Sequence, residues 1–197
     1  MTLKSMTLRS GPKEFTTEAL DRMLESPFVP HNYRGKPRDC KLAADIARQL
    51  DIPVITAMNH LWIIGGQAYI SAQLVITLTN TRGPFMGNIR YHTEGRGDGL
   101  SVTARARFRG SREEAWAHVS MAMVRDEGWI RNPKYVSVPE HMLCYRAAII
   151  LIRRFCPELL AGLTTDKELI DQVYAEESKY ERSFIAQLND HRAARFF

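Results

Sequence analysis

The sequence lacks the motifs by which nucleotide-driven and metal-dependent enzymes are usually recognised. It contains neither a GxxxxGK[ST] phosphate-binding loop nor a GxGxxG motif, so no nucleotide-driven activity is expected. None of its six histidines belongs to an HxH, HxxxH or HExxH pair. No acidic cluster suits a two-metal nuclease, and no Ser/His/Asp set can be assigned. The sequence therefore disfavours an enzyme without excluding one, and it predicts no metal and no cofactor.

Cysteines and long apolar stretches are also scarce. Three cysteines lie in apolar, helix-like stretches without CxxC or Cys/His spacing: Cys40, Cys144 and Cys156. Buried, reduced thiols are expected, which points to the cytoplasm. Residues 1–6 lack an apolar signal core, and the longest apolar run, residues 142–152, contains an arginine and is too short to span a bilayer. We therefore expect a cytoplasmic protein with no membrane partner.

Acidic residues are nearly missing from one segment. Between Arg82 and Arg112 the chain has seven arginines and only two acids, so this segment alone accounts for the net charge of +5. The rest of the chain is neutral overall. Because the charge excess is confined to one segment, it indicates a local binding surface rather than general basicity.

The same segment has the pattern of a β-hairpin. Residues 100–109 alternate with a period of two, which places Val102, Ala104, Ala106 and Phe108 on one face and Thr103, Arg105, Arg107 and Arg109 on the other. Residues 88–92 alternate in the same way, and residues 95–99 between them hold three glycines suited to a turn. We expect the apolar face to pack on a core and the arginine face to point outward.

Two interpretations of the arginine face are open. Like charges on adjacent strands repel each other, and a polyanion relieves that repulsion; the forked donors of arginine suit phosphate groups. The alternative is a solvated strand face on a basic protein. Ordinary surfaces intersperse acids, and this face has almost none, so the pattern favours a phosphate-binding face.

Helices are predicted around the hairpin. Their expected spans are 17–26, 37–50, 72–80, 139–156 and 165–177, from proline positions, capping residues and apolar spacing. A second hairpin is expected over residues 61–70. Residues 111–129 fit either a capped helix or an alternating strand, and we favour a strand near 114–119 followed by a helix to about residue 127.

These elements predict an α+β fold. A small antiparallel sheet with a basic face is expected to pack on several helices, one of them long and central. The expected parts are an N-terminal arm with a short helix over residues 1–36, a nucleic-acid-binding core over 37–175, and a helical tail over 176–197.

The long helix contains arginines whose role is open. Arg146 interrupts an apolar stretch, and Arg153 lies seven residues on, nearly on the same face. An arginine in an apolar helix is rarely buried without a partner. Either Arg146 pairs with an acid from elsewhere, or both arginines line a groove and meet phosphate; the spacing does not decide between them.

The C-terminal half carries a family pattern. The pattern centres on the segment VPEHMLCYRA at residues 138–147, which follows Trp129 and Lys134–Tyr135. After it come RRFCPEL at 153–159, Gly162 and TDKE at 165–168. Upstream are LDIP at 50–53 and IIGGQAYISA at 63–72. Over residues 40–172 this arrangement resembles the RecT/Red-beta family of phage single-strand annealing proteins. The Pro-x-x-Met-Leu-x-x-Arg-Ala element, at residues 139–147, is the most specific part of the resemblance.

The resemblance implies ATP-independent annealing of complementary strands by a ring-shaped or helical homo-oligomer, as part of phage-type homologous recombination. The basic hairpin and the long helix would flank a DNA groove. Apart from the resemblance, Tyr135 or Trp129 could stack on a base, although a buried aromatic side chain is the commoner case. The implied partners are single-stranded DNA, the annealed duplex intermediate, and a phage exonuclease or host single-strand-binding protein in the bacterial cytoplasm. Together with the charge pattern, this predicts a DNA-binding set: Arg90, His92, Arg96, Arg105, Arg107, Arg109, Lys134, Tyr135, Arg146 and Arg153.

Two other functions stay open at this point. The protein could be a nucleic-acid-binding accessory protein without annealing activity or, less favoured, a nucleic-acid-processing enzyme with dispersed catalytic residues. An annealing assay without nucleotide distinguishes an annealing protein from the first alternative. A nuclease or ligase assay with magnesium distinguishes it from the second.

Overall fold

The computed structural model describes residues 22–23 and 26–175 of the chain. The chain divides into two compact units, Met1–Asn59 and His60–Phe197. The predicted boundary between residues 36 and 37 falls inside the first unit, where a helix begins. The predicted tail over residues 176–197 and most of the helix predicted over 17–26 lie outside the described residues.

The described part of the first unit is helical. It contains the 3-10 turn η1 (His31–Tyr33) and the helices α2 (Pro37–Gln49) and α3 (Val54–His60), the last of which ends at the boundary. Pro37 begins α2 as predicted, because its fixed φ suits the first helical turn. The inner side of α2 is closely packed, with Cys40, Ala43 and Ala47 fully buried. Helix α3 was not predicted from the sequence.

The second unit begins with a small sheet. Strands β1 (Leu61–Ile64) and β2 (Gln67–Ile70) form the predicted hairpin, whose turn residues Gly65 and Gly66 both have positive φ. Strand β6 (Thr164–Thr165) pairs in parallel with β2. It is two residues long and was not predicted, since so short a strand leaves no periodicity to read.

A second, antiparallel sheet contains the arginine segment. Its strands are β3 (Arg90–Glu94), β4 (Ser101–Arg107) and β5 (Glu114–Ser120), in the order β3–β4–β5. The turn η2 (Gly97–Gly99) joins the first two, and helix α5 (Met121–Asp126) follows the third. The predicted hairpin, the predicted third strand and the helix after it are therefore confirmed.

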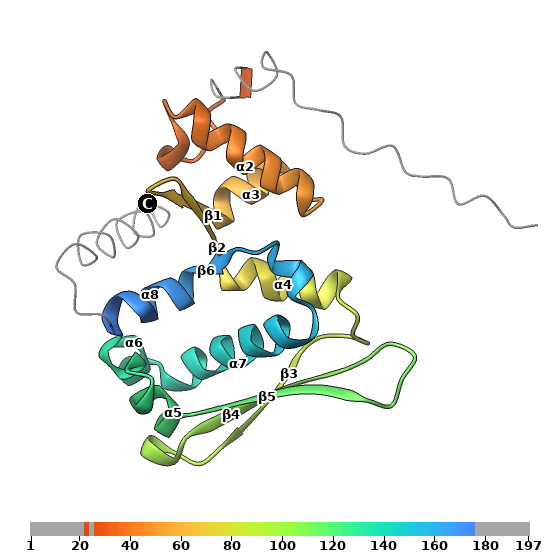
Figure 1. The fold of residues 1–197 in the computed structure, drawn as a ribbon, viewed down its shortest axis with the longest axis vertical. Coiled ribbons are helices and arrows are strands. Elements are labelled where there is room, and N and C mark those ends of the chain that lie inside the picture. The colour runs from red at the N-terminus through yellow and green to blue at the C-terminus, as the bar shows by residue number, and fades with distance from the viewer. Residues whose placement is uncertain (1–21, 24–25, 176–197) are drawn as a thin grey trace, which may run out of the picture. The chain divides into compact units, whose positions relative to one another are not determined.

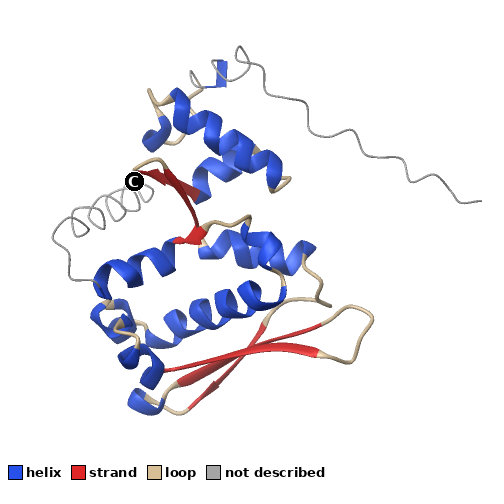
Figure 2. Ribbon diagram, in the orientation of Figure 1, coloured by secondary structure: helices blue, strands red, loops and turns tan. Residues whose placement is uncertain are grey.

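Helices cover one side of this sheet. The longest described helix is α7 (Pro139–Phe155), which packs on β4 and β5 and lies beside α4 (Ala72–Arg82) (Figures 1 and 2). The turns η3 (Trp129–Arg131) and η4 (Pro157–Leu160) flank α7, together with helices α6 (Lys134–Ser137) and α8 (Asp166–Ala175). The predicted α+β fold, with a small basic sheet packed on helices that include one long helix, is confirmed.

Local capping interactions explain where two of these helices begin. The Ser71 hydroxyl accepts a hydrogen bond from the Leu74 amide, at 3.0 Å, before α4. At α8, Thr165 and Glu168 form the predicted capping box: the Glu168 carboxylate accepts from the Thr165 amide and the Thr165 hydroxyl accepts from the Glu168 amide. None of the helices in the described ranges is long and apolar enough to cross a membrane.

The cysteines are free thiols, as predicted. Cys40 and Cys156 are fully buried, and burial raises the pKa of Cys156 to about 12. Cys144 is only half-buried, on the side of α7 that faces α4 and β3. The prediction of buried thiols therefore holds for two of the three.

Candidate nucleic-acid interface

The two faces of the sheet β3–β4–β5 differ sharply in chemistry. On the side of α7, Val102, Ala104 and Ala106 of β4 are buried beside Ala115, Ala117 and Val119 of β5. The other side, which we call the outward face, carries the alternate residues of each strand. It consists of Arg90, His92, Glu94, Ser101, Thr103, Arg105, Arg107, Glu114, Trp116, His118 and Ser120. No described helix of this unit covers the outward face (Figure 1).

Strand register arranges the outward face in rows. Arg90 lies opposite Arg105, and Arg105 lies opposite Trp116, so two guanidinium groups and an indole share one cross-strand row. The Trp116 side chain is 55% exposed, although a large aromatic residue is normally buried where a core can accept it. This row combines cations that suit phosphate with a free aromatic surface.

The neighbouring row contains imidazoles. His92 lies opposite Thr103, and Thr103 lies opposite His118. The Thr103 hydroxyl and Nδ1 of His118 are 3.1 Å apart, within hydrogen-bond distance. These three side chains extend the polar surface along the sheet, next to the arginine row.

The acids of the outward face offset its positive charge weakly. Glu114 lies 3.9 Å from Arg105, and both side chains are at least half exposed. Glu94 lies 3.1 Å from Nε2 of His92, also in solvent. Because exposed pairs of this kind contribute little free energy, a phosphate group competes with them readily.

Two of the predicted arginines are available for a ligand. Arg90 on β3 and Arg96 in the hairpin turn are exposed, and neither guanidinium group has a hydrogen bond or ion pair with any residue in the described ranges. Asp98, in the same turn, is held by Arg125 of α5, so it does not neutralise Arg96. Both arginines retain their full set of donors.

The remaining hairpin arginines have local partners. Arg107 is exposed and uses Nε to donate to the Ser111 carbonyl, at 3.1 Å; within the described residues its terminal nitrogens have no hydrogen-bond partner. Arg109 follows the end of β4 and donates from Nη2 to the carbonyls of Gly83 and Phe85, each at 3.2 Å. Arg109 therefore ties the end of β4 to the segment after α4, and it does not belong to the outward face.

Arg146 has a structural role, the first of the two interpretations left open by the sequence. It is 8% exposed, and its Nη2 lies 2.8 Å from Oδ2 of the fully buried Asp171 on α8. The guanidinium also lies over the Trp129 ring, 3.7 Å from the centroid. Asp171 accepts further hydrogen bonds from Asn132 and Tyr135, and its burial nevertheless raises its pKa. A group enclosed in this way cannot meet a phosphate of bound DNA.

The same network corrects the predicted stacking role of Tyr135. That side chain is 1% exposed, and its hydroxyl donates to Asp171 at 2.8 Å; burial raises its pKa. Trp129 is half-buried beneath Arg146. Neither ring is free to stack on a base. Lys134, on α6, is exposed.

Arg153 is held by an acid as well. Its guanidinium donates twice to Glu168, from Nε at 2.5 Å and from Nη2 at 2.6 Å, and once to the Leu163 carbonyl. Burial alone would raise the pKa of Glu168, but the donors from Arg153 and Thr165 outweigh it and lower that pKa. Arg153 thus joins α7 to the start of α8 and is not a free cation.

Trp116 and His118 were not among the predicted site residues. The alternation of residues 114–120 was visible in the sequence and placed both on one face, but nothing in it showed that this face is continuous with the arginines. Only the register of β5 against β4 brings them together. The sequence signal that could have found these two residues was the predicted third strand, which directly follows the arginine hairpin along the chain.

The outward face offers hydrogen-bond donors, one aromatic surface and imidazoles. Within residues 26–175, no group of three or more His, Cys, Asp or Glu side chains is placed to hold a metal ion.

Comparison with protein-family models, curated proteins and solved structures finds no match for this chain. The resemblance to annealing proteins therefore stays a prediction.

Proposed function

We propose that the protein binds single-stranded DNA on the outward face of the sheet β3–β4–β5. The observation that carries the proposal is the row in which Arg90, Arg105 and the exposed Trp116 lie side by side. Arginine donors grip the phosphate backbone without regard to sequence, and an indole stacks on any base. Both contacts are available at once only when the bases are unpaired.

The proposed site is smaller than the predicted set. It consists of Arg90, His92, Arg105 and Arg107 from the prediction, with Trp116 and His118 added. Arg96 in the hairpin turn and Lys134 on α6 are exposed cations that a longer strand could reach. Arg109, Tyr135, Arg146 and Arg153 are excluded because each is engaged within the fold.

We further propose that the protein anneals complementary strands without ATP. This step rests on the resemblance to the RecT/Red-beta family and on the type of contact that the face offers. Backbone contacts hold a strand extended while most of its bases stay free to pair. Since one subunit offers three arginines on this face, annealing requires several subunits side by side, and we propose a head-to-tail homo-oligomer.

An annealing assay tests this function. Two complementary oligonucleotides, one with a fluorophore and one with a quencher, are mixed with the protein in the absence of any nucleotide. The proposal predicts accelerated quenching that rises steeply with protein concentration, and slower annealing for Trp116→Leu. Arg38→Gln, an exposed residue on α2 in the first unit, is the control outside the proposed site and should anneal like the native protein.

The same assay and a companion incubation with magnesium distinguish the alternatives. Tight binding to single strands with no acceleration of annealing at any concentration would identify an accessory binding protein. Shortened or joined strands on a gel after incubation with magnesium would identify a processing enzyme. Either result would contradict the proposed annealing function.

A further inference from the structure

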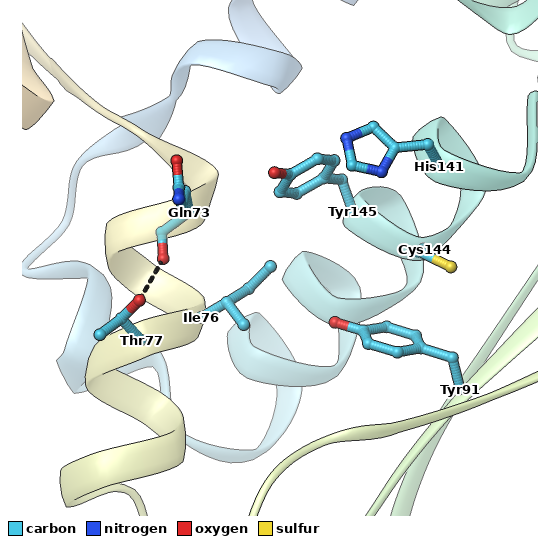
Figure 3. A pocket seen from close by; sticks show the side chains of 7 residues that line it. All are labelled: Gln73, Ile76, Thr77, Tyr91, His141, Cys144 and Tyr145. Carbon is cyan, nitrogen blue, oxygen red and sulfur yellow. Dashed lines mark hydrogen bonds between the residues drawn. The ribbon is translucent and has the colours of Figure 1, made fainter. Parts of the chain in front are cut away.

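A hollow of about 350 Å³ opens between α4, α7 and the edge strand β3. Figure 3 shows its lining: Gln73, Ile76 and Thr77 on one wall, with Tyr145, His141, Cys144 and Tyr91 opposite. The hollow lies entirely within the second unit. Its volume is at the lower end of the range for small-ligand sites, which suits one flat ring system rather than a longer molecule.

The chemistry of the lining suits an aromatic ring. Tyr145 packs edge-on against His141, with ring centroids 4.6 Å apart, and Tyr91 lies on the same wall (Figure 3). Most of the wall is apolar, while the Gln73 amide offers a donor and an acceptor at the opposite wall (Figure 3). Apolar and aromatic walls with a few polar groups are typical of sites that bind planar ligands.

Tyr91 is the residue that connects the hollow to the outward face. It lies on β3 between Arg90 and His92, and alternation turns its ring to the opposite side of the strand. It is 39% exposed, although the residues beside it on the inner face of β4 and β5 are buried. β3 is an edge strand of the sheet. A nucleotide that crosses this edge can therefore meet Arg90 with its phosphate and Tyr91 with its base.

A second hollow continues the first along α7. It has a volume of about 630 Å³, shares His141 and Cys144 with the first hollow, and is lined on its far side by Arg96. The acid in its lining, Glu140, accepts a hydrogen bond from the Thr93 hydroxyl at 2.8 Å. Arg96, whose side chain has no partner among the described residues, thus lies in a hollow adjoining the one lined by aromatic residues; together they suit a phosphate and a base, the two halves of a nucleotide.

We infer that the hollow lined by Tyr91 and Tyr145 holds one nucleobase of the bound strand, turned out of the base stack. The inference rests on the proposed function, because the base must belong to a strand gripped by the outward face. Single-stranded bases are commonly splayed out and stacked on aromatic side chains in this way. Each subunit would then fix one base and so set the spacing of the strand along the oligomer.

Photocrosslinking locates the bases directly. An oligothymidylate in which every second base is 5-iodouracil is bound to the full chain, irradiated and digested, and the crosslinked residues are identified by mass spectrometry. The inference predicts crosslinks at Tyr91 or Tyr145 in addition to Trp116. Tyr69, on strand β2 of the other sheet, is the control and is expected to stay unmodified. Crosslinks at Trp116 alone would overturn the base pocket and leave the proposed function standing.

A substitution gives an independent readout. Tyr145→Leu keeps an apolar side chain on α7 and removes the ring, so it should weaken binding to a twelve-residue oligothymidylate about tenfold, as expected for the loss of one stacked base. Binding to an abasic oligomer of the same length should change less than about twofold, because its phosphate contacts remain. Equal losses on both ligands, or no loss on either, would overturn the inference. No binding of either oligomer by the unmodified protein would contradict the proposed function itself.

Discussion

Arg105 and Trp116 lie directly opposite each other on β4 and β5, both on the face away from α7 and both more than half exposed. The strand pairing fixes this arrangement, since the register of β5 against β4 places Trp116 and Arg105 at directly opposed positions of the sheet. Directly opposed side chains lie about 5 Å apart at Cβ, so one nucleotide can contact both. The pair therefore combines a phosphate contact with a base contact in a single site.

Removing the Trp116 indole should weaken the binding of single-stranded DNA without changing the electrostatic part of that binding. Trp116→Leu should reduce the affinity for single-stranded DNA about tenfold, since stacking contributes roughly 1–3 kcal/mol per base. The dependence of affinity on salt should stay unchanged because no cation is lost. Trp116→Phe, which retains an aromatic surface, should recover most of the affinity. Fluorescence anisotropy with a labelled oligonucleotide measures both quantities, and an altered salt dependence would contradict the stacking role.

The Arg146–Asp171 pair should matter for stability rather than for DNA. Arg146→Ala leaves a buried carboxylate without its cation, and the free energy of unfolding should fall by about 3–5 kcal/mol. Asp171→Asn should also destabilise the protein, because it leaves the Arg146 guanidinium uncompensated. Urea denaturation gives the free energies, and DNA binding is then measured under conditions where each variant is folded. An unchanged melting temperature together with lost DNA binding would contradict the structural role.

Acid should weaken the connection between α7 and α8. The pKa of Glu168 is lower in the folded protein than in the unfolded chain, where it is about 4.3. The ionised carboxylate therefore stabilises the folded protein fully at a pH above about 4.3. This stabilisation is lost as the pH falls through the lower pKa of the folded protein. At pH 7, Glu168→Gln should lower the free energy of unfolding by about 2 kcal/mol, because hydrogen bonds to charged groups contribute more than those between neutral groups.

The pH dependence supplies the control for that prediction. The difference in unfolding free energy between the native protein and Glu168→Gln should shrink between about pH 5 and pH 3, because the carboxylate of the unfolded chain takes up its proton at a higher pH than that of the folded protein. Thermal melts over this range measure the difference. A difference that stays constant down to pH 3 would show that the carboxylate charge does not contribute.

Assembly should accompany annealing. A face with three arginines makes few phosphate contacts, and few contacts give weak binding near physiological salt. Light scattering should therefore detect large particles when the protein is mixed with complementary strands, formed by the same contact repeated between copies. Full annealing activity in a strictly monomeric sample would contradict this mechanism.

The elements that the sequence predicted are those with local signals. The period-two pattern located β4 and β5, and the Thr165–Glu168 capping box located the start of α8. The sequence could not reveal partners that are distant along the chain. Asp171 is 25 residues from Arg146, and no spacing rule connects the two.

Two further errors in the predicted site have the same cause. Alternation placed Arg109 with the other arginines, but the strand ends at Arg107, and the carbonyls of Gly83 and Phe85 then take up its donors. Trp116 was missed because its place beside Arg105 depends on how two strands are aligned. Propensity and capping are encoded locally, whereas the composition of a surface depends on tertiary pairing.

The salt dependence of single-strand binding tests the central claim most directly. The variant in which Arg90, Arg105 and Arg107 are all replaced by glutamine removes the cations of the outward face and leaves its buried side intact. The slope of log affinity against log salt should flatten by about 0.7 for each lost phosphate contact, thus by about 2 for the triple variant. Arg38→Gln, in the first unit, should leave the slope as it is in the native protein. A folded triple variant with the native slope would show that single-stranded DNA does not bind to this face.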